Sequence, residues 1–95
     1  MPAKHKDHAA SHLGLLRKGD SAIVTGLAVV QGAEQTATQN RLLELGFAPG
    51  EKLRVIAESF PRRDPLAVRI GNTTFALRRH EAAMIQVMPV PRAAA

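Results

Sequence analysis

Apolar and polar residues alternate with a period of two along much of the second half of the chain. Such alternation is typical of β-strands that have one face in a core and the other in solvent. Shorter apolar runs occur before and after this region. Together the runs predict strands at residues 21–27, 51–58, 66–70, 73–77 and 84–88. Between the third and fourth strands, Gly71-Asn72 predicts a two-residue hairpin turn that begins with glycine.

The run 51–58 also predicts which side chains face the core. Regular alternation points Leu53, Val55 and Ala57 inward. The segment 59–65 that follows contains two prolines, so it is expected to be a loop. The outward positions of the run are then Lys52, Arg54 and Glu58.

One segment has helical periodicity. This helix is expected to run from Thr36 to Leu45, with Thr36 as its N-cap and Gln39 completing a capping box. Leu42 and Leu45 lie three residues apart, so they share one face of the helix. Residues 78–83 predict one further helical turn.

The chain reverses direction directly after this helix. Gly46 stands where helices commonly end in the left-handed conformation, which carries no steric penalty for glycine. Phe47 is the apolar residue that folds back onto the last turn, as in a Schellman motif. Pro49-Gly50 suits the centre of a type II turn, which leads into the next strand. The segment is thus a predicted helix-to-strand joint.

Five short strands and one helix, joined by tight turns, predict a mainly β fold. We expect a small, partly closed β-barrel with an inserted helical segment. The chain has 95 residues and a hydrophobic content of 45%, which suits one folded domain. This domain is placed at residues 13–88, between a flexible histidine-containing tail at 1–12 and a loose tail at 89–95.

The composition argues against several classes of function. The chain has no cysteine, which excludes disulfides, thiolate metal sites and thiol catalysis. No apolar run approaches the roughly 18 residues of a membrane helix, and the polar N-terminal segment lacks the apolar part of a secretion signal. We therefore expect a cytoplasmic protein. No phosphate-binding or nucleophile motif is present, so the sequence predicts neither catalysis nor a cofactor.

The net charge of +5 raises the question of nucleic-acid binding. Between residues 62 and 79, five arginines stand against one acid, Asp64, and can form a basic patch. Proteins that bind single strands also use exposed aromatic platforms, whereas this chain has three phenylalanines and neither Trp nor Tyr. A solvated, arginine-rich rim on a small barrel is therefore favoured over direct nucleic-acid binding.

Several segments resemble the FeoA family in their order and spacing. Each segment alone is weakly specific, but the ordered set covers roughly residues 13–88. The segments are Leu16-x-x-Gly19-Asp20-x-Ala22-x-Val24, Arg41-Leu42-Leu43-Glu44-Leu45-Gly46-Phe47, Pro49-Gly50, Asp64-Pro65, Val68-Arg69, Gly71 and Ala76-Leu77-Arg78-Arg79-x-Glu81-Ala82.

The resemblance implies an SH3-like β-barrel and a protein that acts by contact and not by catalysis. The implied partner is FeoB, the G-domain-bearing ferrous-iron transporter of the bacterial inner membrane, to whose inner face the protein would be recruited. The same domain recurs at the C-terminus of metal-dependent repressors of the DtxR type, where a winged-helix portion precedes it. No such portion precedes it here, so the stand-alone transporter partner is preferred. A repressor-like interaction module and a basic nucleic-acid-binding barrel are the alternatives.

Two features depart from the family pattern. Arg63 stands before the Asp-Pro pair where family members often have glycine, so we expect the loop to bend differently. The first twelve residues have no family counterpart and contain His5, His8 and His12. His8 and His12 would share a helix face and, with Asp7, offer a set of transition-metal ligands. A frayed tail loses entropy when a metal orders it. No metal site is therefore predicted, and metal binding by the tail histidines is the weaker alternative.

Docking on a partner is expected to use the helix and a basic rim. On the helix, Leu43 lies about 100° from Leu42 and either packs against the loop at 28–30 or stays exposed. The basic rim can meet an acidic surface on the transporter or anionic lipid headgroups nearby, and such charges act mainly on association rate. The predicted partner-binding residues are Arg41, Leu42, Leu43, Arg62, Arg63, Arg78 and Arg79.

Overall fold

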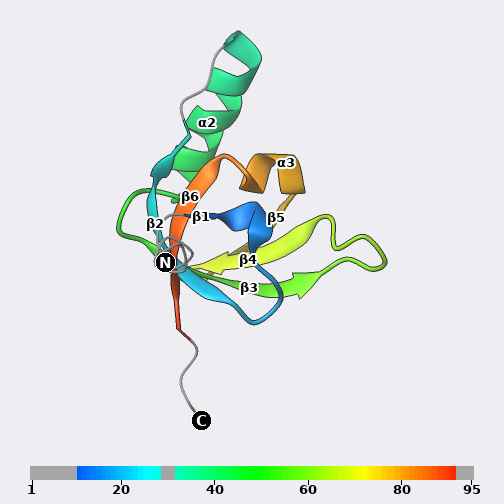
Figure 1. Cartoon of the computed structure of the whole chain (residues 1–95). Helices are drawn as coiled ribbons and strands as arrows, with labels where there is room; N and C mark the ends of the chain where they lie inside the picture. Colours follow the sequence, from blue (N-terminus) through cyan, green and yellow to red (C-terminus); the bar gives the residue numbers. More distant parts are fainter. Residues whose placement is uncertain (1–10, 29–31, 92–95) are drawn as a thin grey trace, which may run out of the picture.

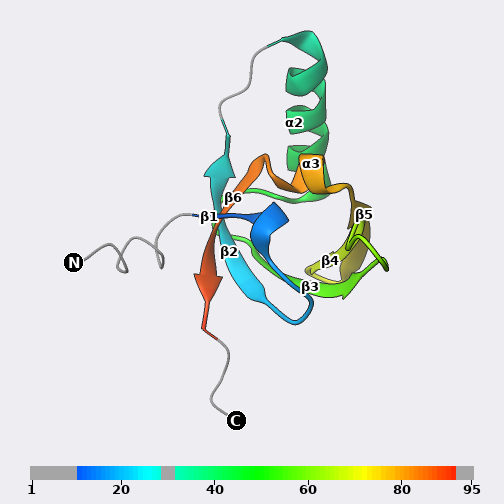
Figure 2. The same cartoon turned by 45° about the vertical axis from the view of Figure 1, so that its right-hand side comes forward.

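A computed structural model of the chain describes residues 11–28 and 32–91. These residues form an antiparallel sheet that curls around a core, with one longer helix rising from it (Figures 1 and 2). The helical elements are the 3-10 turn η1 (Leu13–Leu15), α2 (Ala33–Leu45) and α3 (Arg79–Ala82). The strands are β1 (Ser11–His12), β2 (Ser21–Leu27), β3 (Lys52–Glu58), β4 (Leu66–Ile70), β5 (Thr73–Leu77) and β6 (Ile85–Val90).

The described strands pair in the order β1-β6-β2-β3-β4-β5, and each pairing is antiparallel. The final strand β6 lies between β1 and β2, so the two ends of the described chain are held side by side. β1 and β5 form the two edges, so the sheet is not fully closed. The predicted mainly β, partly closed barrel with an inserted helix is thereby confirmed.

Strand pairing extends beyond the expected domain limits at 13 and 88. In β1, Ser11 pairs with Val87. At the other end β6 continues to Val90, with Pro89 opposite Ala22. The tails expected at 1–12 and 89–95 are therefore shorter than predicted where the structure describes them. Residues 1–10 and 92–95 lie outside the described ranges.

β3 follows the predicted alternation only as far as Val55. Leu53 and Val55 are buried, as expected. A register shift between Val55 and Ala57 in the pairing with β4 then reverses the alternation, because a bulge adds one residue to one strand. Ala57 is exposed, and Glu58 lies opposite the buried Leu66. The predicted inward position of Ala57 and outward position of Glu58 are therefore wrong.

The core is apolar throughout the part of the chain that the structure describes, with no buried polar or charged residue. The helix contributes Leu42, which is fully buried, and Leu45, which packs against the same core. Their predicted shared face is thus confirmed. Phe47 is fully buried, and its ring centroid lies 5.7 Å from that of Phe75. Burying a side chain of this size contributes about 1.5–3 kcal/mol.

The helix α2 begins three residues earlier than predicted. Its N-cap is Gly32, with Ala33 as the first helical residue and Glu34 in the first turn. Thr36 therefore lies inside the helix, and its hydroxyl donates to the carbonyl of Gly32 at 2.9 Å. The predicted capping box is wrong because Gln39 does not reach the N-terminus of the helix: its side-chain amide donates to the Ala28 carbonyl at 2.9 Å.

The predicted joint after α2 is confirmed. Gly46 adopts φ 115° in the left-handed region. The Phe47 N–H donates to the Leu42 carbonyl at 3.1 Å, which is the long hydrogen bond of a Schellman motif. Gly50 has φ 94°, and the N–H of Glu51, the last residue of the turn, donates to the Ala48 carbonyl at 3.1 Å. Both glycines thus occupy conformations that other residues avoid.

The first half of α2 stands clear of the barrel (Figures 1 and 2). Residues 33–37 are all exposed, and Leu42 is the buried residue of the helix. Contact with the core therefore comes from the last turns alone. Within the described ranges, no helix combines the length and the apolar character needed to cross a bilayer.

We predict that Gly46→Ala lowers the free energy of unfolding by about 1–2 kcal/mol. A Cβ at this position would meet no atom within 4 Å, so the cost arises from holding alanine at positive φ. Gly26→Ala is the matched control, because Gly26 has no positive φ and the nearest atom to its Cβ is Gln86 Oε1 at 3.7 Å. Urea unfolding compares the two variants, and equal stability would contradict the prediction.

Candidate functional site

The guanidinium of Arg79, the first residue of α3, joins four segments of the fold. Its Nε donates to the Arg63 carbonyl at 2.7 Å. Its Nη1 donates to the Gly14 carbonyl and, at 3.4 Å, to the Leu16 carbonyl. Its Nη2 donates to Glu58 Oε2 at 3.0 Å and forms an ion pair with it. The side chain therefore connects η1, the end of β3, the β3–β4 loop and α3.

This ion pair depends on the bulge in β3, which turns Glu58 toward the barrel interior. The side chains of Glu58 and Arg79 are 12% and 23% exposed. A second cation, Arg17, lies 3.6 Å from the same carboxylate oxygen, but its side chain is 61% exposed. Solvent screens such an exposed partner. The Arg79–Glu58 pair therefore acts mainly as a structural cross-link.

The same residue fixes the β3–β4 loop (59–65). The backbone N–H of Arg79 donates to Asp64 Oδ1 at 2.9 Å, and the Ser59 N–H donates to the Pro65 carbonyl at 3.0 Å. Arg63 adopts φ 59°, which is the conformation that glycine takes most readily. The expectation that an arginine here would bend the loop differently is therefore wrong at this residue, and the hydrogen bond to its carbonyl holds the conformation.

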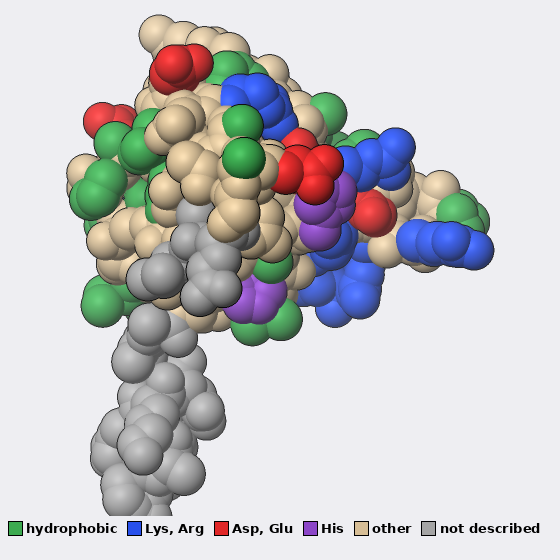
Figure 3. Space-filling view, turned by 90° about the horizontal axis from the view of Figure 1, so that it is seen from above, with side chains coloured by type: hydrophobic (Ala, Val, Ile, Leu, Met, Phe, Trp, Pro, Cys, Tyr) green, Lys and Arg blue, Asp and Glu red, His purple; other side chains and the backbone are tan. Residues whose placement is uncertain are grey.

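The tip of this loop combines an aromatic ring with positive charge. Phe60 is 94% exposed, and Arg62 and Arg63 are exposed beside it. The loop projects from the end of the barrel (Figure 1). Seen from above, Lys and Arg side chains gather on the side where it projects (Figure 3). An aromatic ring this exposed is unusual in a small domain and suits a contact with another surface.

A second exposed surface lies on α2. Leu43 is 43% exposed. Of the two positions expected for it, packed against the loop or exposed, the structure has the exposed one. Val29 and Val30 of the loop named in the other alternative lie outside the described residues. Arg41 donates to Glu81 Oε2 at 2.6 Å, and its side chain is 49% exposed. This ion pair ties α2 to α3.

The structure distributes the seven predicted docking residues among different environments. Leu42 is fully buried and Arg79 has its donors occupied within the fold, so neither presents a free surface. Arg41 is shared between solvent and its ion pair. The remaining four are exposed: Leu43, Arg62, Arg63 and Arg78.

Phe60 is an exposed residue that was not among the predicted docking residues. The other two phenylalanines belong to the core: Phe47 is fully buried, and Phe75 is partly buried and packs against it. The signal for the third was present, since Phe60 falls in a segment that Pro61 and Pro65 exclude from a central strand. A phenylalanine in such a loop has few ways to reach the core.

The histidines form no metal centre within the described residues. His12 pairs with Gln86 in the sheet, and its Nδ1 is buried without a hydrogen-bond partner. No cluster of three or more His, Asp or Glu side chains arranged to hold a metal occurs in ranges 11–28 and 32–91. His5 and His8, the other members of the possible tail site, lie outside those ranges.

Comparison with known proteins shows which family this chain resembles. Residues 12–89 match the model of the FeoA domain. A curated relative from Porphyromonas gingivalis, an Fe(2+) transport protein A/Fe(2+) transporter FeoB fusion protein, is 36% identical over 75 residues, which is 79% of this chain. The chain spans only 8% of the length of that relative.

Solved structures show the same fold. FeoA of Stenotrophomonas maltophilia, an SH3 domain protein solved in complex with zinc, is 35% identical with a TM-score of 0.75, and the match covers 87% of this chain and 99% of that one. FeoA from Chlorobium tepidum is 33% identical with a TM-score of 0.70, over 85% of this chain and 71% of that one. A manganese-dependent transcriptional repressor shares the fold alone, at 22% identity and a TM-score of 0.72, over 86% of this chain and 42% of the repressor.

We predict that Arg79→Ala lowers the free energy of unfolding by about 2–4 kcal/mol, because it removes several charge-assisted hydrogen bonds and leaves Glu58 largely enclosed without its main partner. Arg79→Lys should recover little of this, since an ammonium cannot reproduce the guanidinium fork. Arg78→Ala is the control, as Arg78 is an exposed neighbour of the same charge. Thermal and urea unfolding of the three variants test this, and a destabilisation by Arg78→Ala as large as that by Arg79→Ala would refute the cross-link.

Proposed function

Because this chain belongs to the FeoA family, we propose that it is a non-catalytic accessory protein of bacterial ferrous iron uptake that docks on the cytoplasmic part of a FeoB-type transporter. The family is associated with ferrous iron transport, and the observation that supports docking most directly is the P. gingivalis relative, in which the FeoA and FeoB parts belong to one polypeptide. On this proposal the protein works in the cytoplasm, at the inner face of the inner membrane.

A fusion supports association for a physical reason. Two parts of one chain encounter each other at an effective concentration that is millimolar for a short flexible linker. A tether alone provides no contact, so association of the two parts also needs a docking surface with affinity of its own. The exposed residues described above supply that surface.

We assign the docking surface to Leu43 on α2 and to the tip of the β3–β4 loop. Aromatic and aliphatic anchors that become desolvated dominate the energy of most interfaces, and Leu43 and Phe60 are exposed side chains of this kind. Arg62 and Arg63 flank the ring of Phe60 and carry the charge that attracts an acidic surface on the transporter. The cross-link by Arg79 holds the base of the loop, so its tip is presented from a fixed position.

Retention of the detergent-solubilised full-length transporter by this protein, immobilised and measured across a salt series, tests the proposed function. Retention at physiological salt supports docking. Loss of the transporter at every salt from a folded bait would overturn it. Recovery of nucleic acid with a steep dependence on salt would instead favour the basic-barrel alternative.

We predict that Leu43→Asp abolishes retention at every salt concentration, because a charge placed in a desolvated contact costs binding energy that salt does not restore. Asn40→Asp introduces the same charge on an exposed position of α2 and should leave retention unchanged. Circular dichroism confirms that both variants are folded. Full retention by Leu43→Asp would remove the helix from the docking surface.

We predict that Arg62→Gln combined with Arg63→Asn weakens retention about threefold to tenfold at low salt and little at high salt, because exposed charges act through screened attraction. Asparagine is chosen because it tolerates the left-handed conformation of Arg63. Phe60→Ser should weaken retention at both salt concentrations, since its contribution is apolar. Parallel salt curves for the arginine variant and the wild type would exclude the loop charges.

A further inference from the structure

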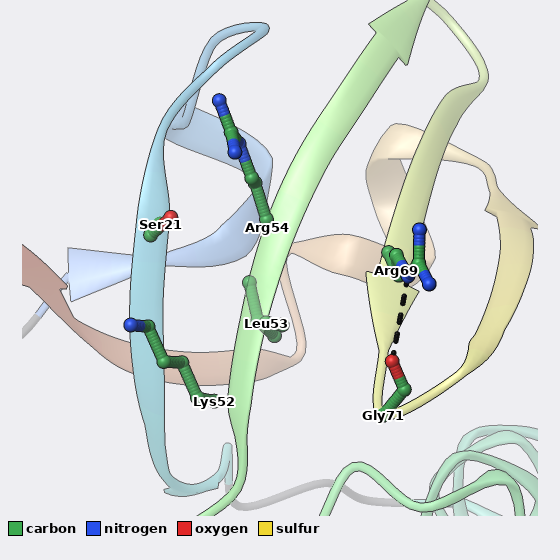
Figure 4. A pocket seen from close by; sticks show the side chains of 6 residues that line it. All are labelled: Ser21, Lys52, Leu53, Arg54, Arg69 and Gly71. Atoms are coloured by element: carbon green, nitrogen blue, oxygen red, sulfur yellow. Dashed lines mark hydrogen bonds between the residues drawn. The ribbon is translucent and has the colours of Figure 1, made fainter.

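A shallow pocket of about 250 Å³ lies on the outer face of the sheet, and none of its lining residues belongs to the docking surface assigned above. It opens over β2, β3 and β4 (Figure 4). Three of its lining side chains are cationic and none is acidic. The lining residues are Ser21, Lys52, Leu53, Arg54, Arg69 and Gly71.

The strand register sets two of the cations against each other. Arg54 on β3 pairs directly with Arg69 on β4, and Ser21 on β2 pairs with Arg54. Directly opposed residues on one face of an antiparallel pair have Cβ atoms about 4.5–5.5 Å apart, and like charges in that position are destabilising. The fold thus places two like charges at directly paired strand positions beside a concave surface.

No acidic residue of the described ranges forms an ion pair within 4 Å with these three cations. The ion pairs among residues 11–28 and 32–91 involve Arg17, Arg41 and Arg79 as the cations. Arg69 makes one long hydrogen bond, from Nε to the Gly71 carbonyl at 3.4 Å. The three cations therefore have donors available for a ligand. Unfavourable local arrangements that persist in a fold often mark functional sites.

The chemistry of the lining selects a phosphate-type ligand. Arginine offers a planar fork that matches phosphate oxygens, and lysine offers a compact point charge. Ser21 adds a hydroxyl at the edge. In Figure 4 the cationic groups are spread: Lys52 extends toward β2, Arg54 extends over the space between β2 and β3, and Arg69 turns toward Gly71. A ligand with one negative charge cannot meet all three.

We propose that this pocket binds phosphate groups of a ligand that carries two or more adjacent negative charges. Such groups occur in soluble diphosphates and triphosphates and at the surface of anionic phospholipid membranes. Either source neutralises the opposed Arg54 and Arg69, so ligand binding removes a repulsion that the free protein retains. The proposal does not depend on docking to the transporter.

Thermal unfolding with pyrophosphate at constant ionic strength tests the proposal. At about tenfold its Kd, the ligand is expected to raise the Tm of a domain this small by about 5–10 °C. Arg69→Gln should have two effects. Without ligand, the variant is expected to have a slightly higher Tm than the wild type, because one of two like charges at paired positions is gone. With pyrophosphate, its Tm should not rise. Arg62→Gln removes an equal charge elsewhere and should keep the full shift.

A second measurement identifies the source of the phosphate. Sedimentation with phosphatidylglycerol vesicles, compared with phosphatidylcholine vesicles, is run with and without pyrophosphate. Retention that pyrophosphate and Arg69→Gln both abolish assigns the pocket to lipid headgroups, whereas a Tm shift without retention assigns it to a soluble phosphate compound. Absence of any effect of pyrophosphate and of vesicles, an undiminished shift in Arg69→Gln, or a response to polyglutamate alone would overturn the proposal.

Discussion

The ion pair between Arg79 and Glu58 is the interaction on which the arrangement of the barrel end depends. One guanidinium reaches the carbonyls of η1, the carbonyl of Arg63 and the end of β3, while the backbone of the same residue holds Asp64. Three regions that are far apart in sequence thus meet at this residue: η1, the end of β3 with the loop that follows it, and α3. An arginine is required because its donors diverge in one plane, so a single side chain satisfies acceptors that lie on different elements.

The sequence predicted those parts of the fold that local chemistry determines. Strand positions followed from alternation, and the joint at Gly46 followed from the steric freedom of glycine and the rigidity of proline. The bulge between Val55 and Ala57 could not be predicted, because it arises in the pairing of β3 with β4. Without the bulge, Glu58 would be expected to face solvent, so its ion pair with Arg79 could not be predicted either. The start of α2 could not be predicted from a capping residue, because its N-cap is Gly32, which has no side chain to form a cap.

The same distinction applies to the candidate functional residues: exposure of the loop arginines was predictable from the sequence, whereas environments set by contacts between distant segments were not. Arg62 and Arg63 were identified by charge density and are exposed as expected, whereas Arg79 looked equivalent in sequence and proved to be a structural residue. Lys52 and Arg54 were predicted to face outward but not to form a binding site, because isolated outward cations on a strand are common. Their significance arises only when register places Arg54 opposite Arg69, which is a property of two strands together and of neither alone.

The position of α2 has a consequence for how the molecule opens. Its first turns bury no side chain, and its attachment to the core rests on Leu42 and the last turn. An isolated helix of this length is marginal in water, so the outer turns can unwind while the barrel stays intact. Local unfolding of that kind sets the hydrogen-exchange protection of a segment independently of global stability. Amides in the outer turns of α2 are therefore expected to exchange by local opening, while its last turn, which holds Leu42 in the core, exchanges with the barrel.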